Sequence, residues 1–226
     1  MPRWFITGTD TDAGKTAVTA ALAAGLRRQG LTVRAVKPLM SGHHPENTES
    51  DAHRIAAAAG HPVACHTWWQ TPISPHRAAW VEDKSLDVES LRKWLETHTA
   101  DQVLIEGVGG WRVPLAMTPK GETLYSVSDL ARDAGGEVLV VAANKLGVLN
   151  HVTLTVEAIQ REGFSVRGII LNQVNAQEDS ISEKTNLADL RHILSVPCTP
   201  CPFIEDFNSH LLGNIGQRIC ADLGLI

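Results

Sequence analysis

A glycine-rich loop between an apolar segment and an alanine-rich segment constrains the fold of this chain more than any other feature. Residues 8–16 read Gly-Thr-Asp-Thr-Asp-Ala-Gly-Lys-Thr, directly after the apolar segment at residues 4–7. When such a loop joins a buried strand to a helix, its backbone N–H groups face phosphate oxygens and the helix N-terminus adds partial positive charge. We therefore predict a phosphate-binding loop (P-loop), in which Lys15 reaches the outer phosphates and Thr16 binds magnesium.

The spacing of this loop departs from the usual pattern. Five residues separate Gly8 from Gly14, where four are usual, so we interpret the loop as a variant. The loop contains two carboxylates, and the second of them, Asp12, would lie near a bound triphosphate. We expect its side chain to face away from the phosphates or toward a cationic substrate.

Apolar segments alternate with helical segments along the chain. The expected strands are Trp4 to Thr7, Val33 to Val36, Val103 to Ile105, Val138 to Ala143 and Val166 to Leu171, and the expected helices are Thr16 to Arg28, Leu86 to Glu96, Val127 to Asp133, Val152 to Arg161 and Leu187 to Leu194. This alternation predicts an α/β fold of the P-loop NTPase kind, with a mostly parallel central sheet and helices on both faces. We expect a single domain spanning 1–226, with ligands at the carboxyl ends of the strands.

Two charged residues are expected at those strand ends. Glu106 ends the apolar run that begins at Val103, and it supplies the carboxylate that a P-loop needs to complete a magnesium site. Lys37 follows the strand ending at Val36, where its charge would neutralise a transferring phosphoryl group. Asp51 is a second candidate carboxylate, although an acid at a helix N-terminus explains its position better on sequence grounds alone.

The composition favours a small-molecule partner. The formal charge of −5 and the pI near 6.0 leave no basic excess for nucleic acid or an anionic membrane. We see no export signal or membrane span and expect a cytoplasmic protein. Cys198 and Cys201 have CxxC spacing without a second pair, so we interpret them as an incidental thiol pair.

Taken together, these segments resemble the dethiobiotin synthetase family along most of the chain and in the same order. The most specific part is the P-loop followed by the Lys-Pro-Leu-Met-Ser-Gly segment that begins at Lys37. The matching stretches are residues 7–16, 36–42, 50–52, 74–76, 105–111, 144–147 with 150–151, and 172. Seven ordered matches are far more specific than a Gly-Lys-Thr triplet alone.

The resemblance implies a homodimeric enzyme that uses ATP, Mg²⁺ and CO₂ to close a ureido ring on 7,8-diaminopelargonic acid. A carbamate would form on one amine, and its oxygen would attack the γ-phosphate. The second amine would then close the ring as phosphate leaves.

The resemblance also implies roles for single residues. Lys37 and Lys15 would be catalytic, while Thr16, Asp51 and Glu106 would hold the metal. The diamine or carbamate would contact Thr11, Lys37 and Ser41, and its tail carboxylate would contact Gly147 and Asn150 at a helix start in the partner subunit. Asn172 would bind adenine beside Pro202 and Phe203. The full expected nucleotide site comprises Asp12, Ala13, Gly14, Lys15, Thr16, Ala17, Asp51, Glu106, Gly107, Gly109, Asn172, Pro202 and Phe203.

Other P-loop proteins are alternatives. Asn144-Lys145 begins like the guanine-reading N-K-x-D motif of GTPases, but Gly147 stands where the acid is required. Positioning ATPases of the ParA/MinD type share the variant loop, but they have a lysine where this chain has Asp10. A small-molecule kinase or a related amide ligase also stays open. For Asn150, a plain helix cap is the alternative role.

Overall fold

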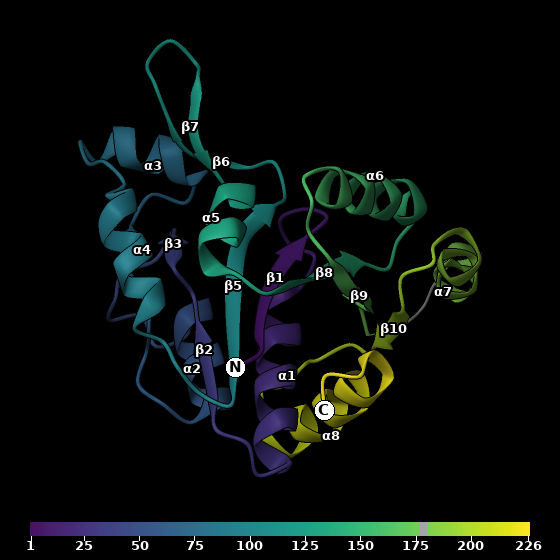
Figure 1. Cartoon of the computed structure of the whole chain (residues 1–226). Coiled ribbons are helices and arrows are strands. Elements are labelled where there is room, and N and C mark those ends of the chain that lie inside the picture. Colours follow the sequence, from purple (N-terminus) through teal and green to yellow (C-terminus); the bar gives the residue numbers. More distant parts are fainter. Residues whose placement is uncertain (177–179) are drawn as a thin grey trace.

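A six-stranded parallel sheet forms the centre of the computed structural model, which describes residues 1–176 and 180–226 (Figure 1). Its order is β10-β9-β8-β1-β5-β2, and every neighbouring pair is parallel. The strands are β1 (Arg3–Gly8), β2 (Val33–Val36), β5 (Gln102–Gly110), β8 (Glu137–Ala143), β9 (Val166–Asn172) and β10 (Cys198–Cys201). All strands of a parallel sheet end at the same edge, so the segments after them converge there.

Helices cover both faces of this sheet, which confirms the predicted α/β fold. Along β1, Trp4 and Ile6 face one apolar layer and Phe5 faces the other, as expected for a strand buried on both sides. The first layer contains α1 (Lys15–Arg28), α2 (Asp51–Ala59) and α8 (Ser209–Leu223). The second contains α3 (Pro75–Val81), α4 (Val88–Glu96), α5 (Val127–Ala134), α6 (Val148–Arg161) and α7 (Ile181–Ile193).

Several short elements were not predicted. A parallel pair joins β3 (Leu39–Ser41) to β4 (Thr67–Trp69), and an antiparallel pair joins β6 (Pro114–Met117) to β7 (Thr123–Ser126). The helices α2, α3 and α8 and the edge strand β10 were also missed. Strand β10 extends the central sheet, and α2, α3 and α8 cover its faces.

Three expected helix starts were wrong, in each case because a capping residue sets the boundary. Helix α4 starts at Val88, since the Asp87 side chain accepts a hydrogen bond from the backbone N–H of Ser90. Helix α6 starts four residues earlier than expected, after Gly147 in a left-handed conformation. Helix α7 starts at Ile181, because Ser180 and Glu183 form a capping box.

Helices α1 and α8 approach each other closely at two glycines. A Cβ atom built on Gly216 would overlap the carbonyl oxygen of Ala21, and one built on Gly25 would overlap the backbone of Gly216. Only glycine therefore fits at this crossing. The contact fixes the helix that begins at the P-loop against the last helix of the chain.

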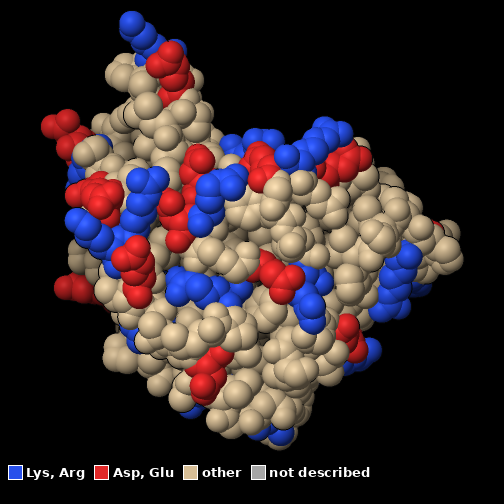
Figure 2. Space-filling view, in the orientation of Figure 1, with Lys and Arg blue, Asp and Glu red and all other residues tan. Residues whose placement is uncertain are grey.

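The charged side chains are mixed by sign on the face shown in Figure 2, where no large area of a single sign is visible. Among the described residues, the helices are all too short or too polar to cross a lipid bilayer. The single-domain organisation and the cytoplasmic location stay predictions.

His98 at the end of α4 is a buried histidine among cations. Its ring stacks edge-on against Trp94 at 4.2 Å between centroids, and its Nδ1 accepts a hydrogen bond from Arg34 Nε at 3.3 Å. The pKa of His98 is lowered to about 4, first by burial and then by the positive charges of Arg34 and Arg3. The folded protein therefore holds this imidazole neutral.

We expect this histidine to destabilise the fold in acid. Between pH 6.5 and pH 4 the unfolded chain binds a proton at His98 that the folded chain excludes, so the free energy of unfolding falls as the pH falls through this window. Urea titrations at pH 7 and pH 5 measure the loss. His98→Asn keeps an acceptor for Arg34 without titrating, so it should lose less stability over that interval. An equal loss in both proteins would contradict the assignment.

Candidate functional site

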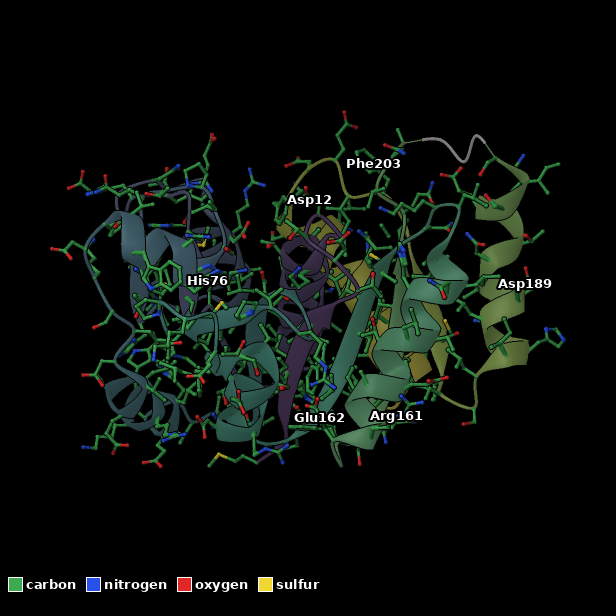
Figure 3. All side chains as sticks on the ribbon, turned by 90° about the horizontal axis from the view of Figure 1, so that it is seen from above. Asp12, His76, Arg161, Glu162, Asp189 and Phe203 are labelled. Carbon is green, nitrogen blue, oxygen red and sulfur yellow. The ribbon has the colours of Figure 1, made fainter. Side chains whose placement is uncertain are left out.

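A cavity of about 750 Å³ opens at the carboxyl edge of the sheet. It is lined by the P-loop, by the ends of β5 and β9, by Lys37 after β2, and by the segments that follow β3, β4 and β10. Its volume lies within the usual range for small-molecule sites. In the view from above, Asp12 of the P-loop and Phe203 after β10 lie close together at this edge, whereas Asp189 on α7 lies farther out (Figure 3).

The P-loop has the conformation that phosphate binding requires. Gly14 is left-handed, with φ of 86°, and a Cβ atom there would overlap the side-chain amide of Asn172. Helix α1 then begins at Lys15, whose Nζ donates to the carbonyl oxygen of Asp10 at 3.1 Å. Burial, and then the nearby charge of Lys37, lower the pKa of Lys15 to about 8. An anion bound in this loop would raise the pKa of Lys15 again, because it favours the charged ammonium.

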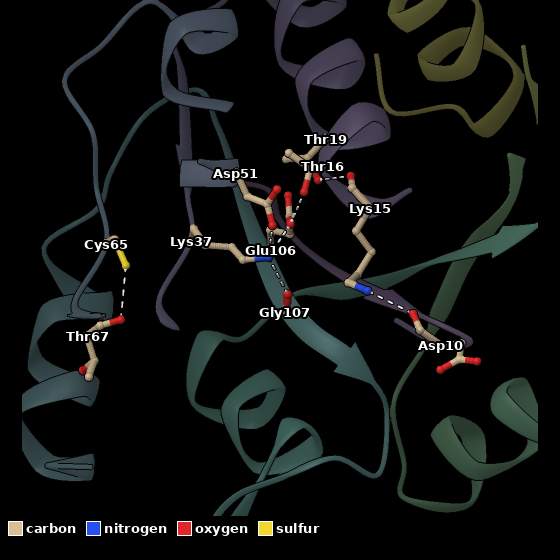
Figure 4. Close-up of polar contacts among 10 residues, drawn as sticks. All are labelled: Asp10, Lys15, Thr16, Thr19, Lys37, Asp51, Cys65, Thr67, Glu106 and Gly107. Carbon is tan, nitrogen blue, oxygen red and sulfur yellow. Dashed lines mark hydrogen bonds and ion pairs between the residues drawn. The ribbon is translucent and has the colours of Figure 1, made fainter. Parts of the chain in front are cut away.

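Lys37 lies between two carboxylates (Figure 4). Its Nζ donates to Glu106 Oε1 at 2.5 Å and to the carbonyl oxygen of Gly107 at 3.3 Å, and it lies 3.4 Å from Asp51 Oδ2. Burial disfavours the ammonium, but the charges of Glu106 and Asp51 outweigh burial and raise the pKa of Lys37. The lysine is therefore charged at neutral pH.

Asp51 belongs to this cluster as well as to a helix terminus. It is the first residue of α2, and burial disfavours its charged form, but Lys37 and a hydrogen bond from Thr16 lower its pKa. The helix-terminal position of Asp51 is confirmed, and its role as a metal ligand stays a prediction.

The oxygen atoms around Lys37 suit a small divalent cation. Thr16 Oγ1 donates to Glu106 Oε1 at 2.8 Å, and Glu106 Oε2 is buried without a hydrogen-bond partner. Two carboxylates and a hydroxyl are the hard oxygen donors that Mg²⁺ prefers. A buried carboxylate oxygen without a partner is costly unless a proton donor or a cation joins it.

The opposite end of the cavity has amide and aromatic character. The Asn172 side chain at the end of β9 donates to the carbonyl oxygen of Ala13 at 3.1 Å, which ties this strand to the P-loop. Phe203 lines the cavity, whereas Pro202 is exposed and does not. A buried network of side-chain amides lies next to the carboxyl end of β9. In it, Asn144 donates to Gln173 at 3.0 Å and accepts from Asn186 at 2.9 Å.

The structure brings most of the predicted residues to this cavity. Thr11, Ser41 and the exposed Asp12 line it together with Gly14, Lys15, Ala17, Gly109 and the metal-site candidates, whereas Ala13 is buried and does not line it. The carbonyl of Gly107 contacts Lys37 rather than the cavity. Gly147 and Asn150 are exposed at the start of α6 and are not among the residues that line the cavity of their own chain.

Some lining residues were not predicted from the sequence. They include Arg54 on α2 and Phe207 before α8. Arg54 follows Asp51 by three residues, so the two lie on neighbouring parts of one helix face. That spacing was the available signal for Arg54.

Cys198 and Cys201 do not form a paired site. Both are free and buried, and they pack in the two different apolar layers on opposite faces of β10. Burial raises the pKa of Cys198 to about 11 and that of Cys201 to about 12. Within residues 1–176 and 180–226, no group of three or more His, Cys, Asp or Glu side chains has the arrangement of a metal site.

Comparisons with known proteins place this cavity in context. Residues 3–201 match a family model described as an AAA domain. The chain is 34% identical over 221 residues to an ATP-dependent dethiobiotin synthetase of Thermodesulfovibrio yellowstonii, covering 93% of this chain and 92% of the relative. It is 36% identical to the enzyme of the same name from Ralstonia nicotianae, with 92% and 93% covered.

A solved structure shares the fold at much lower identity. The septum site-determining protein MinD from Pyrococcus horikoshii, complexed with Mg-ADP, superposes with a TM-score of 0.55 at 16% identity. The match covers 99% of this chain and 98% of MinD. At this identity the likeness concerns the fold alone.

Proposed function

The chain belongs to the dethiobiotin synthetase family, and from this premise we propose how its residues carry out the reaction. The enzyme uses ATP and Mg²⁺ and acts in biotin biosynthesis, where 7,8-diaminopelargonic acid and CO₂ become dethiobiotin. One observation supports the residue assignment most strongly: Lys37, Thr16 and Glu106 are joined by hydrogen bonds of 2.5 and 2.8 Å beside the P-loop.

The metal is held by Thr16, Asp51 and Glu106 in this proposal. All three line the cavity, and the partnerless Glu106 Oε2 is the oxygen best placed to receive a cation. When bound, Mg²⁺ supplies positive charge to the outer phosphate oxygens.

The two buried lysines gather charge during the reaction. Lys15 holds the outer phosphates from the start of α1, and Lys37 contacts the carbamate and phosphoryl oxygens from the opposite wall. Both cations are fixed before substrate arrives, so little reorganisation is needed as negative charge develops. Thr11 and Ser41, which both line the cavity, orient the diamine.

The nucleotide extends from Lys15 and Thr16 toward Asn172 and Phe203, with Phe203 against the base. Gly14, Ala13 and Ala17 provide the backbone around it. This direction is supported by the cavity, which runs without interruption from the P-loop to the segment after β10.

The substrate's tail carboxylate is bound by a second copy of the chain. Gly147 and Asn150 lie at the exposed N-terminus of α6, where free N–H groups attract a carboxylate. They do not line the cavity of their own chain, so a homodimer would bring them to it from the partner subunit.

The reaction itself is tested directly with the purified protein. It is incubated with ATP, Mg²⁺, ¹⁴C-bicarbonate and 7,8-diaminopelargonic acid, and the acid-stable label is identified as a cyclic urea by chromatography and mass spectrometry. Omission of the diamine should leave no acid-stable label. Phosphate release that is unaffected by the diamine would favour an ATPase of the MinD kind instead.

We expect Glu106→Gln to raise the magnesium requirement. The substitution removes the charge of the buried carboxylate oxygen that has no partner in the protein, so the Mg²⁺ concentration for half-maximal activity should rise roughly 10-fold or more. A magnesium titration at saturating ATP measures the change. Glu89→Gln, which changes an exposed residue of α4, is the matched control. If the titration curve of Glu106→Gln matched that of this control, Glu106 would not belong to the metal site.

A further inference from the structure

Arg54 and Phe207, which are distant in sequence, contact each other in the lining of the cavity. The guanidinium carbon of Arg54 on α2 lies 4.9 Å from the ring centroid of Phe207, which immediately precedes the cap of α8. Both side chains line the same cavity as the P-loop. The contact therefore joins the second turn of α2 to the segment after β10.

The position of this pair follows from its neighbours. Asp51, one turn before Arg54 on α2, lies at the Lys37 end of the cavity, whereas Phe203, four residues before Phe207, lies at the Asn172 end. A nucleotide that extends from the metal site to Phe203 must pass between these ends. With the nucleotide in the proposed direction, the Arg54–Phe207 contact would lie beside its middle, at the ribose and the α-phosphate.

The charge of Arg54 is available to a ligand. Lys37 is engaged by Glu106 and Asp51, but no Asp or Glu within residues 1–176 and 180–226 forms an ion pair with Arg54. Among the described residues, the guanidinium contacts the ring of Phe207, which orients it without neutralising its charge. A planar guanidinium with free N–H groups is well suited to bind phosphate oxygens.

We propose that Arg54 and Phe207 form a clasp over the nucleotide, in which Arg54 binds the α-phosphate and Phe207 holds Arg54 in place. The inference rests on the proposed direction of the nucleotide in this site. It adds a residue of α2 that sets nucleotide affinity, separate from the residues that gather charge at the γ-phosphate.

Nucleotide affinity tests the clasp without turnover. Isothermal titration of the whole protein with Mg-ADP and with AMP measures Kd for both ligands, each of which carries an α-phosphate. Arg54→Ala should raise both Kd values about 10- to 100-fold, the usual effect of losing a charge-assisted hydrogen bond. Arg54→Lys should recover part of the loss, and Phe207→Ala should raise Kd about 2- to 5-fold.

Steady-state kinetics test the position of the clasp. In Arg54→Ala the KM for ATP should rise while the KM for the diamine stays unchanged. Arg132→Ala is the matched control, because Arg132 lies 4.6 Å from the ring of Phe164 in a similar pair that does not line the cavity. Thermal unfolding checks that each variant is folded.

Two outcomes would overturn the clasp. One is an unchanged Kd for ADP in Arg54→Ala. The other is a higher KM for the diamine at normal ADP affinity, which would place Arg54 at the substrate end. A wild-type protein that binds ADP but forms no cyclic urea would contradict the proposed reaction. The ADP titrations of the Arg54 variants would still test the clasp in that case.

Discussion

Replacing Lys37 with methionine is expected to lower kcat about 100- to 1000-fold, the range seen when one preorganised charge-stabilising donor is removed from an active site. Methionine nearly matches the length of the lysine chain but carries no charge. The Kd for Mg-ADP should change little, because Lys15 and the backbone of the P-loop hold the phosphates on the other wall. Rates of cyclic-urea formation and ADP titrations measure the two effects separately.

The same substitution also affects stability. Lys37 compensates the buried charge of Glu106, and loss of one partner of a buried pair costs about 3–5 kcal/mol in the absence of a replacement cation. Assays should therefore be run at low temperature, with circular dichroism to establish folding. Lys84→Met, which removes an exposed lysine paired with Glu82, is the control. A folded Lys37→Met protein with wild-type kcat would refute the catalytic role.

Gly216→Ala should be the most destabilising single-methyl change in the α1–α8 contact. The added Cβ would overlap the carbonyl oxygen of Ala21 inside α1, and a helix backbone cannot move aside without separating the two helices. We expect the free energy of unfolding to fall by about 3 kcal/mol, at the upper end for overpacked cores. Urea unfolding at pH 7 measures this difference.

Gly213→Ala is a matched control in the same helix. Its Cβ would meet the side chain of Arg28, which can rotate away, so the expected change is about 1 kcal/mol or less in either direction. Equal changes in stability for the two substitutions would show that close approach to the α1 backbone is not what requires glycine at position 216, since the gain in helix propensity is the same for both. The difference between the two variants thus isolates the contact with α1.

The reactive end of the cavity was largely predictable from charged residues next to apolar runs. Lys37 follows β2 as expected, whereas Glu106 was wrongly expected at a strand end, because β5 continues through the glycines to Gly110. Parallel strands still bring both residues toward one edge of the sheet. The P-loop carries its own local signal. For these residues, position in the sequence determines position in the fold.

Helix α8 and strand β10 were missed because their sequences conflict with their local structure. Gly213 and Gly216 lower helix propensity, but close packing against α1 requires one of them. Pro200 weakens the strand signal in β10, yet an edge strand tolerates proline because one side needs no partner. Tertiary contacts override local preference in both cases.

Arg54 and Phe207 were missed for a different reason. Neither residue lies at the end of a predicted element, and their contact arises only when α2 and the segment before α8 fold against α1. Its spacing of three residues from Asp51 was the one local signal, and that spacing alone does not distinguish Arg54 from a solvated helix arginine. Such a pair is visible only in three dimensions.

The Gly216 crossing also bears on the order in which the protein matures during synthesis. Within residues 1–226 the phosphate loop is synthesised well before α8, the helix that supports α1. Contacts between such distant segments close slowly, since a long intervening chain must first be ordered. A nascent chain therefore carries the phosphate loop before its supporting helix, and we expect nucleotide to stabilise the fold only once α8 has been made.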